Sequence, residues 1–312
     1  MYTYEVDHEK KQVYAVIKNL DLTRIAQSGQ CFRWKKVEQE EEGDNAEQAC
    51  QGEWGKSTEC SAEYEIPAFH RKLRVRQQGE SFTFFCSEET VQNVWRSYLD
   101  FDTPYEEYLA SVDERDSFLK AAAAYGNGIR ILRQDPWEAA VSFLISQCNN
   151  IPRIKGCIEK ICAHFGEEGY YFPSPERLAG LTEEELLVFR KECSLGYRDE
   201  YILNFAKKVS EGSFSLEECG KLPYEECVRE LRTLQGVGQK VADCIALYGF
   251  HKIDAFPIDV HMKRILYERY FTPDLETFSR SKQLKAMEER NFSQYTGYRG
   301  IVQQWIFAYN LI

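Results

Sequence analysis

A glycine-rich turn followed by a lysine has the clearest chemical meaning in this sequence. Gly236 and Gly238 flank a single valine, and Lys240 comes two residues later in a run of helix-forming residues. Glycine permits a positive φ and a close backbone approach, and a helix N-terminus presents free N–H groups and the positive end of its dipole. We therefore expect a contact with a backbone phosphate of DNA, which positions a duplex without reading its sequence. An ordinary turn at a helix end would also explain the two glycines.

Lys240 itself has two possible roles. It lies one turn into the expected helix, and Cys244 follows four residues later on the same face. A free lysine is mostly protonated at neutral pH, so its amine is a nucleophile only where it is desolvated or repelled by other charges. Most lysines are solvated surface groups. These residues alone leave open both a nucleophilic amine and a surface lysine beside a phosphate.

An aspartate opens the next expected helix, directly after a proline and an isoleucine. Pro257 breaks the chain, and Asp259 is expected to be the N-cap, where its carboxylate accepts backbone N–H bonds that favour the ionised form. An ionised carboxylate facing a sugar stabilises the positive charge that develops as a glycosidic bond breaks. Capping alone is an equally good explanation. His261 follows at the helix N-terminus, either as a donor to a phosphate or as a surface histidine.

The elements before these residues are expected to be mainly strands. Residues 12–20 are rich in β-branched and aromatic side chains, and apolar residues alternate with polar ones at 73–75 and 82–84, as in half-buried strands. Between them, residues 37–65 are acidic and have little periodicity, which is typical of a solvated insertion. We predict an N-terminal domain over residues 1–115 that is built on an antiparallel β-sheet.

The remainder of the chain is expected to be helical. Thr182 and Glu185 form a capping box before two leucines, and no repeat of 20–50 residues is apparent. We therefore predict an α+β fold, in which the β-rich domain is followed by an all-helical domain over residues 116–312.

Composition and charge limit the possible functions. The chain of 312 residues is 43% hydrophobic, which is enough for a substantial core. Its net charge of −11 argues against a nucleic-acid-binding protein, but ten acidic residues against the single Lys56 place most of that charge in residues 37–65. The rest of the surface can still carry a basic groove. Eleven cysteines without a CxxC pair are expected to be reduced thiols.

The location of the protein follows from features that the sequence lacks. No stretch approaches the ~20 apolar residues of a membrane span, and the first residues have no signal-peptide pattern. We expect an intracellular protein, in the cytoplasm or nucleoid of a bacterium or in the nucleus of a eukaryote.

The hairpin glycines, Lys240, Pro257 and Asp259 together resemble the helix-hairpin-helix, Gly/Pro-Asp superfamily of base-excision DNA glycosylases. The lysine resembles that of the bifunctional branch, which also cleaves the strand. No cysteine follows Cys244, which disfavours the branch with an Fe–S cluster. Further blocks are similar to 8-oxoguanine DNA glycosylases and run in family order along nearly the whole chain. They are residues 28–34, 132–136, 149–151, 195–198 and 303–307.

The resemblance implies how a flipped base is held. Gly29 would sense oxidation, because oxidised guanine gains a proton at N7 that a backbone carbonyl accepts, whereas guanine presents a lone pair there. Cys244 and Phe307 would sandwich the base, and Gln303 would read its Watson–Crick edge. A turn between strands and core packing are the alternatives for Gly29 and Phe307.

The resemblance also implies contacts with the duplex. Residues expected to fill the space left by the base and to contact the orphaned cytosine are Asn149, Arg153, Tyr197 and Arg198, with Tyr197 as the wedge. Contacts with the DNA backbone are expected from Gly236, Gly238, Val241 and His261. Two positions depart from the family pattern. Cys148 replaces an asparagine, which favours a relaxed choice of opposite base, and Tyr248 replaces a smaller or more flexible apolar residue near the base.

The implied reaction needs no cofactor. Asp259 would stabilise the sugar cation, Lys240 would attack the anomeric carbon, and β-elimination from the Schiff base would cleave the strand. The resemblance also implies a structural cation site at the backbone carbonyls of Arg232, Leu234 and Val237, as in similar hairpins. The expected partner of this monomer is double-stranded DNA containing 8-oxoguanine. The alternatives are a glycosylase of the same superfamily for another damaged base and a non-enzymatic DNA-binding protein.

Overall fold

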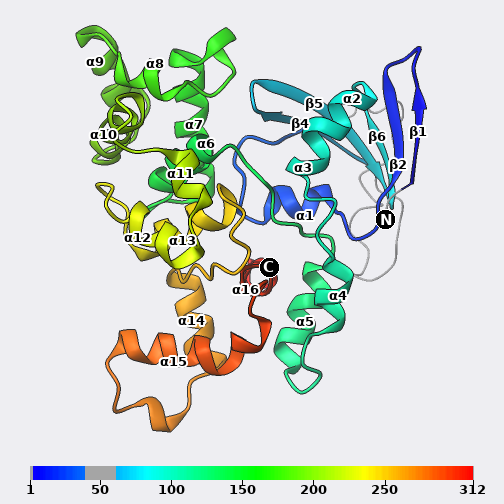
Figure 1. Cartoon of the computed structure of the whole chain (residues 1–312), viewed down its shortest axis with the longest axis vertical. Coiled ribbons are helices and arrows are strands. Elements are labelled where there is room, and N and C mark those ends of the chain that lie inside the picture. The colour runs from blue at the N-terminus through cyan, green and yellow to red at the C-terminus, as the bar shows by residue number, and fades with distance from the viewer. Residues whose placement is uncertain (1–2, 39–60, 312) are drawn as a thin grey trace.

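The computed structural model describes residues 3–38 and 61–311. Its N-terminal part contains a six-stranded antiparallel sheet in the order β1-β2-β6-β5-β4-β3 (Figure 1). The strands are β1 (Thr3–Asp7), β2 (Gln12–Val16), β3 (Lys35–Lys36), β4 (Ala62–Ala68), β5 (Arg71–Gln78) and β6 (Ser81–Phe84). The predicted antiparallel sheet is thus confirmed.

The alternation in the sequence decides which face of the sheet is buried. Phe84 pairs with both Val13 and Val75, and all three side chains are fully buried. Tyr14, whose side chain points to the opposite face of β2, is 39% exposed. The sheet therefore buries one apolar face and leaves the other to solvent.

One boundary of the expected acidic insertion is wrong. Residues 62–65 belong to strand β4, and Glu63 is buried there because its carboxylate accepts hydrogen bonds from Arg74 and Arg76 of strand β5. Pairing with two arginines allows an acidic residue to take a strand position that composition alone assigns to a solvated segment. Residues 39–60 of the predicted insertion lie outside the described residues.

Short helices cover the buried face of the sheet. They are α1 (Leu22–Gln27), α2 (Glu88–Thr90), a π-helical turn (Val91–Trp95) and α3 (Arg96–Tyr98). Ser87 caps this run, since its hydroxyl accepts from the Thr90 N–H. Trp95 is fully buried against the sheet side chains.

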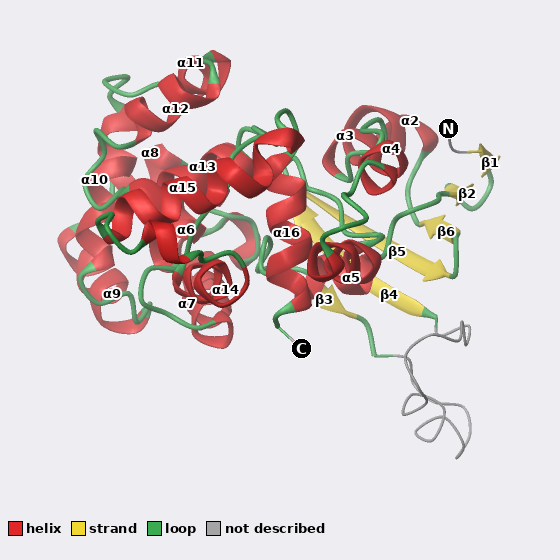
Figure 2. Cartoon of the chain, turned by 90° about the horizontal axis from the view of Figure 1, so that it is seen from below, coloured by secondary structure: helices red, strands yellow, loops and turns green. Residues whose placement is uncertain are grey.

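Helices make up the remainder of the chain (Figures 1 and 2). They are α4 (Tyr105–Ala110), α5 (Ser117–Gly126), α6 (Pro136–Ile145), α7 (Ile151–Phe165), α8 (Pro175–Ala179), α9 (Glu183–Glu192), α10 (Arg198–Ser210), α11 (Leu216–Lys221), α12 (Tyr224–Leu231), α13 (Gln239–Tyr248), α14 (Val260–Arg269), α15 (Arg280–Phe292) and α16 (Arg299–Tyr309). The predicted capping box of α9 is present, with both hydrogen bonds between Thr182 and Glu185 formed. Within the described ranges, no helix has the length and apolar character needed to cross a membrane.

The C-terminal helix α16 connects the two parts of the molecule. It packs along α5. In Figure 2 it lies between the sheet and the group of helices that includes α13 and α14. Gly126 permits this contact, because a Cβ there would lie 2.2 Å from the Trp305 ring. Side chains cross the expected division at residue 115, since Leu132 joins the sheet core and Phe32 joins the helical core. The domain boundary therefore stays a prediction.

Candidate active site

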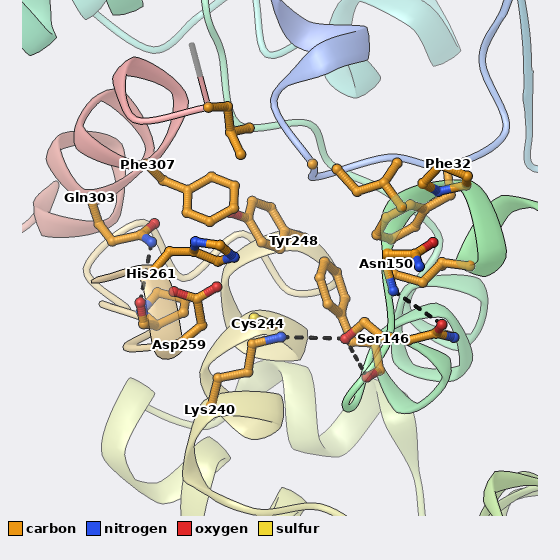
Figure 3. A pocket seen from close by; sticks show the side chains of 18 residues that line it. Phe32, Ser146, Asn150, Lys240, Cys244, Tyr248, Asp259, His261, Gln303 and Phe307 are labelled. Carbon is orange, nitrogen blue, oxygen red and sulfur yellow. Dashed lines mark hydrogen bonds between the residues drawn. The ribbon is translucent and has the colours of Figure 1, made fainter. Parts of the chain in front are cut away.

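A cavity of about 390 Å³ lies where α13, α14, α16, the end of α6 and the turn after α1 meet (Figure 3). It brings together residues that are more than 200 positions apart in the sequence. The predicted residues that line it are Gly29, Asn149, Lys240, Cys244, Asp259, His261, Gln303 and Phe307. Phe143, Ser146 and Tyr248 also line it. No sequence signal pointed to Phe143 or Ser146, because neither belongs to a motif.

Lys240 enters the cavity from the first turn of α13. Gly238 caps this helix in an extended conformation. The Lys240 Nζ atom donates to Ser146 Oγ over 3.3 Å and lies 5.7 Å from the centre of the Phe143 ring. One turn further, burial raises the pKa of the Cys244 thiol to about 11, so this thiol stays protonated at neutral pH. The amine of Lys240 and the protonated thiol of Cys244 thus lie on the same wall of the cavity.

Asp259 faces the same cavity from the start of α14. Its Oδ1 atom accepts from the Met262 N–H over 2.8 Å, which confirms the predicted N-cap. The cap fixes the carboxylate on the cavity wall, while Val260 and His261 next to it are exposed. Lys240 and Asp259 therefore present an amine and a carboxyl group to the same cavity.

Gly29 and α16 form the opposite side. Gly29 has a φ of +77°, which favours glycine, and a Cβ there would lie 3.2 Å from the Phe307 ring, which would have to shift slightly. Gln303 is 3% exposed, and its Nε2 atom donates to the Pro257 carbonyl over 3.2 Å. Among the described residues, its Oε1 atom has no hydrogen-bond partner. This buried acceptor is available to a ligand in the cavity.

The predicted hairpin is formed by α12 and α13. The Asp243 carboxylate accepts from the Tyr224 hydroxyl over 2.8 Å and from Gln239 Nε2 over 3.0 Å, which joins the two helices. Burial raises the pKa of Asp243 to about 6. Gly236 has a φ of +82° and lies against the ring of Tyr201, where a Cβ would be 2.3 Å away.

The outer surface of the hairpin is open at one glycine. A Cβ at Gly238 would meet no described atom within 4 Å. Val241 is buried, so only its backbone is suited to the predicted DNA contact. The Leu234 carbonyl, one of three expected cation ligands with Arg232 and Val237, accepts from the Val237 N–H over 3.1 Å. That cation site stays a prediction.

Of the four residues predicted to fill the space left by the base, three lie outside the cavity. Tyr197 is 52% exposed, as a wedge residue must be. Arg153 is exposed and reaches the Ser194 carbonyl over 3.4 Å. Arg198 differs from the expectation, since it is 4% exposed and points inward. It therefore does not present its donors to a base in this structure.

The inward position of Arg198 stabilises the turn after α6. Its guanidinium donates to the carbonyls of Gln147, Cys148 and Leu195. Cys148 is exposed, with a φ of +48°. Next to it, Asn149 lines the cavity and donates to the Ile145 carbonyl over 3.1 Å. The turn that carries Cys148 and Asn149 is thus held from inside by an arginine.

Comparison with known families gives two adjacent matches. Residues 13–140 match the N-terminal domain of 8-oxoguanine DNA glycosylase. Residues 141–289 match the HhH-GPD superfamily of base excision DNA repair proteins.

Individual relatives match most of the chain. The N-glycosylase/DNA lyase OGG1 of Arabidopsis thaliana is 30% identical over 302 residues, which covers 91% of this chain and 75% of the relative. The N-glycosylase/DNA lyase of Saccharomyces cerevisiae is 29% identical and covers 80% of this chain and 68% of the relative. The Clostridium acetobutylicum 8-oxoguanine glycosylase/lyase, solved with double-stranded DNA containing cytosine opposite 8-oxoguanine, superposes with a TM-score of 0.78 at 32% identity. That match covers 100% of this chain and 99% of the other.

Proposed function

This chain belongs to the 8-oxoguanine DNA glycosylase family of the HhH-GPD superfamily, and we propose that it excises 8-oxoguanine from double-stranded DNA and then cleaves the strand. One observation carries the proposal: Lys240, Asp259 and Gly29 line a single cavity. A base must leave the duplex to enter such a cavity. The proposed setting is the compartment that holds DNA, the bacterial nucleoid or the eukaryotic nucleus.

The cavity offers complementary groups to the flipped base. The Gly29 carbonyl accepts the N7–H of 8-oxoguanine, which guanine lacks. Gln303 presents to donors on the Watson–Crick edge an Oε1 acceptor that has no partner in the described part of the chain. Phe307 and the neutral thiol of Cys244 supply the two faces that enclose the ring. Selection of the oxidised base thus rests on one added proton.

The proposed reaction uses the two polar groups on the other wall. The amine of Lys240 forms a bond to C1′ as the bond to the base breaks. The departing base takes the electron pair of the broken bond and the proton that the amine nitrogen releases. The Asp259 carboxylate stabilises the positive charge on the sugar during this exchange. Ring opening gives a Schiff base on Lys240, and loss of a proton from C2′ then expels the 3′ phosphate by β-elimination.

Borohydride trapping tests this proposal. The chain is incubated with a duplex containing 8-oxoguanine opposite cytosine, and we expect a covalent protein–DNA adduct that is absent in Lys240→Gln. Lys285→Gln is the matched control, because Lys285 is exposed on α15 and pairs with Glu289 away from the cavity. No adduct with the native chain, or an undiminished adduct with Lys240→Gln, contradicts the proposal.

The same experiment separates the alternatives. A non-enzymatic DNA-binding protein would use the hairpin but would not require Lys240 and Asp259 to face one cavity, and it would give no adduct. A glycosylase for another damaged base would form an adduct only with a duplex that carries that base.

A further inference from the structure

A chain of buried hydrogen bonds links the end of α13 to the turn that contains Gly29. The Tyr248 hydroxyl donates to Gln304 Oε1, and Gln304 Nε2 donates to the Ser28 carbonyl over 2.8 Å. Gln304 is 1% exposed, and Tyr248 and Ser28 are also buried. Tyr248 lies on the cavity wall among the side chains drawn in Figure 3. The Ser28 carbonyl, which precedes Gly29, is therefore bound by a chain of hydrogen bonds that starts at a residue of the cavity wall.

A second link from Tyr248 holds the carbonyl after Gly29. The Gln134 N–H donates to the Tyr248 carbonyl over 3.2 Å, and Gln134 Nε2 donates to the Gln30 carbonyl over 2.7 Å. Both carbonyls that flank Gly29 thus accept from a side-chain amide. Among the described residues, the structure records no donor to the Gly29 carbonyl itself.

The side chain of Gln30 holds the same turn through three further hydrogen bonds. It is fully buried, donates to Ser28 Oγ and to the Arg130 carbonyl, and accepts from the Leu132 N–H, each over 2.9 Å. These bonds fix the turn against the segment before α6. The orientation of the Gly29 peptide then depends on how its two neighbours are held.

The Tyr248 hydroxyl and the Ser28 carbonyl together fix the orientation of the Gln304 amide. A side-chain amide can present either oxygen or nitrogen to a neighbour. Because Oε1 of Gln304 accepts from Tyr248, Nε2 is left to face the Ser28 carbonyl. A flipped amide would place two acceptors against each other at Ser28 and would lose the bond from Tyr248 to Oε1, which is costly at a buried site.

We propose that Tyr248 and Gln304 are positioning residues that orient the Gly29 carbonyl for reading the oxidised base. This inference rests on the proposed function. Tyr248 and Lys240 belong to the same helix, two turns apart. Helix α13 therefore places both the nucleophile and, through Tyr248, the group that selects the base.

The test compares two activities of each variant in one sample. The first is single-turnover excision of 8-oxoguanine opposite cytosine, which needs base recognition. The second is cleavage of a duplex with a preformed abasic site, which needs Lys240 but no base. The ratio of the two rates is insensitive to the folded fraction, so a partly unfolded variant still reports on recognition.

We expect Tyr248→Phe, which loses one hydrogen bond, to lower this ratio about tenfold, and Gln304→Ala, which loses two, to lower it at least as much. The double variant should lower it no further than the larger single effect, because both act through one chain of contacts. The matched control is Tyr267→Phe. Tyr267 donates to Gln283 Oε1 over 2.8 Å, and Gln283 donates to the Leu275 carbonyl over 3.0 Å, away from the cavity.

The control variant should keep the ratio of the native chain. An unchanged ratio in Tyr248→Phe, or additive losses in the double variant, would overturn the positioning role. Failure of the native chain to excise 8-oxoguanine would instead contradict the proposed function, so the two failures are distinguishable.

Discussion

The Nζ atom of Lys240 lies 3.3 Å from the Oγ atom of Ser146, the C-cap residue of helix α6. Ser146 donates its own hydroxyl proton to the Phe143 carbonyl, so its lone pairs are free to accept from Lys240. This contact therefore holds the Lys240 amine at the end of α6, on the wall of the cavity.

Ser146→Ala should slow excision without removing the nucleophile. Without this acceptor, the Lys240 side chain loses a hydrogen bond that holds it at the end of α6, so single-turnover excision should slow about tenfold. Rates measured with a duplex containing 8-oxoguanine check this. An unchanged rate would mean that Ser146 does not position Lys240.

Asp259→Asn should keep the helix cap and remove the negative charge. Asparagine still accepts the Met262 N–H, so thermal stability should change little, whereas excision should slow on the order of 100-fold because the carboxylate charge is lost. Asp116→Asn is the control, since Asp116 caps α5 through the Leu119 N–H over 2.9 Å. Comparable excision by both variants would mean that the charge of Asp259 has no role in the reaction.

Gly29→Ala should cost both stability and recognition. The positive φ makes alanine unfavourable by about 1 kcal/mol, and the added Cβ meets the Phe307 ring. Gly212→Ala carries the same conformational cost, because Gly212 has a φ of +72° but open space around it. Denaturant unfolding should show similar losses, while excision of 8-oxoguanine should fall at least tenfold further in Gly29→Ala. Equal excision by the two variants would contradict the sensor role.

The choice of opposite base should be relaxed. Arg198 is buried and bound to the carbonyls of Gln147 and Cys148, and Cys148 offers only a weak thiol donor. Excision rates opposite the four bases should therefore lie within about tenfold of each other, a spread of roughly 1.4 kcal/mol. Cys148→Asn should raise the preference for cytosine. Turnover opposite cytosine alone would refute this prediction.

Asp243 should make stability decrease with rising pH. Burial raises its pKa from an ordinary value of 3.8 to about 6, so between these values the folded chain binds a proton that the unfolded chain releases. The stabilisation is present below pH 4 and is lost as pH rises through 6. Asp243→Asn should flatten this decrease in thermal unfolding measured from pH 4 to 7.

The control is Asp102, whose contribution to stability changes with pH in the opposite direction. The bond with Arg96 lowers the pKa of Asp102, so its contribution is present above the ordinary value and is lost on acidification. Asp102→Asn should therefore weaken the decrease of stability at low pH. The same pH response in both variants would contradict the burial of a titrating Asp243.

The sequence by itself determined the helix caps, the buried face of a strand and the position of Lys240 in its helix, because these depend on residues close together in the chain. Asp259 caps α14, and Thr182 and Glu185 form their box, because these bonds join residues three positions apart. The alternation at 82–84 likewise fixed a buried strand face. Motif spacing placed Lys240 in the first turn of its helix.

Only the tertiary structure decided which side chains complete the site. Ser146 and Lys240 are 94 residues apart, and Gln304 and Ser28 are 276 residues apart. Such contacts depend on how α6, α13 and α16 pack, which no local spacing records. Packing also turned Arg198 inward, where buried backbone carbonyls need donors. Sequence thus specified the reactive groups, and packing specified their orientation.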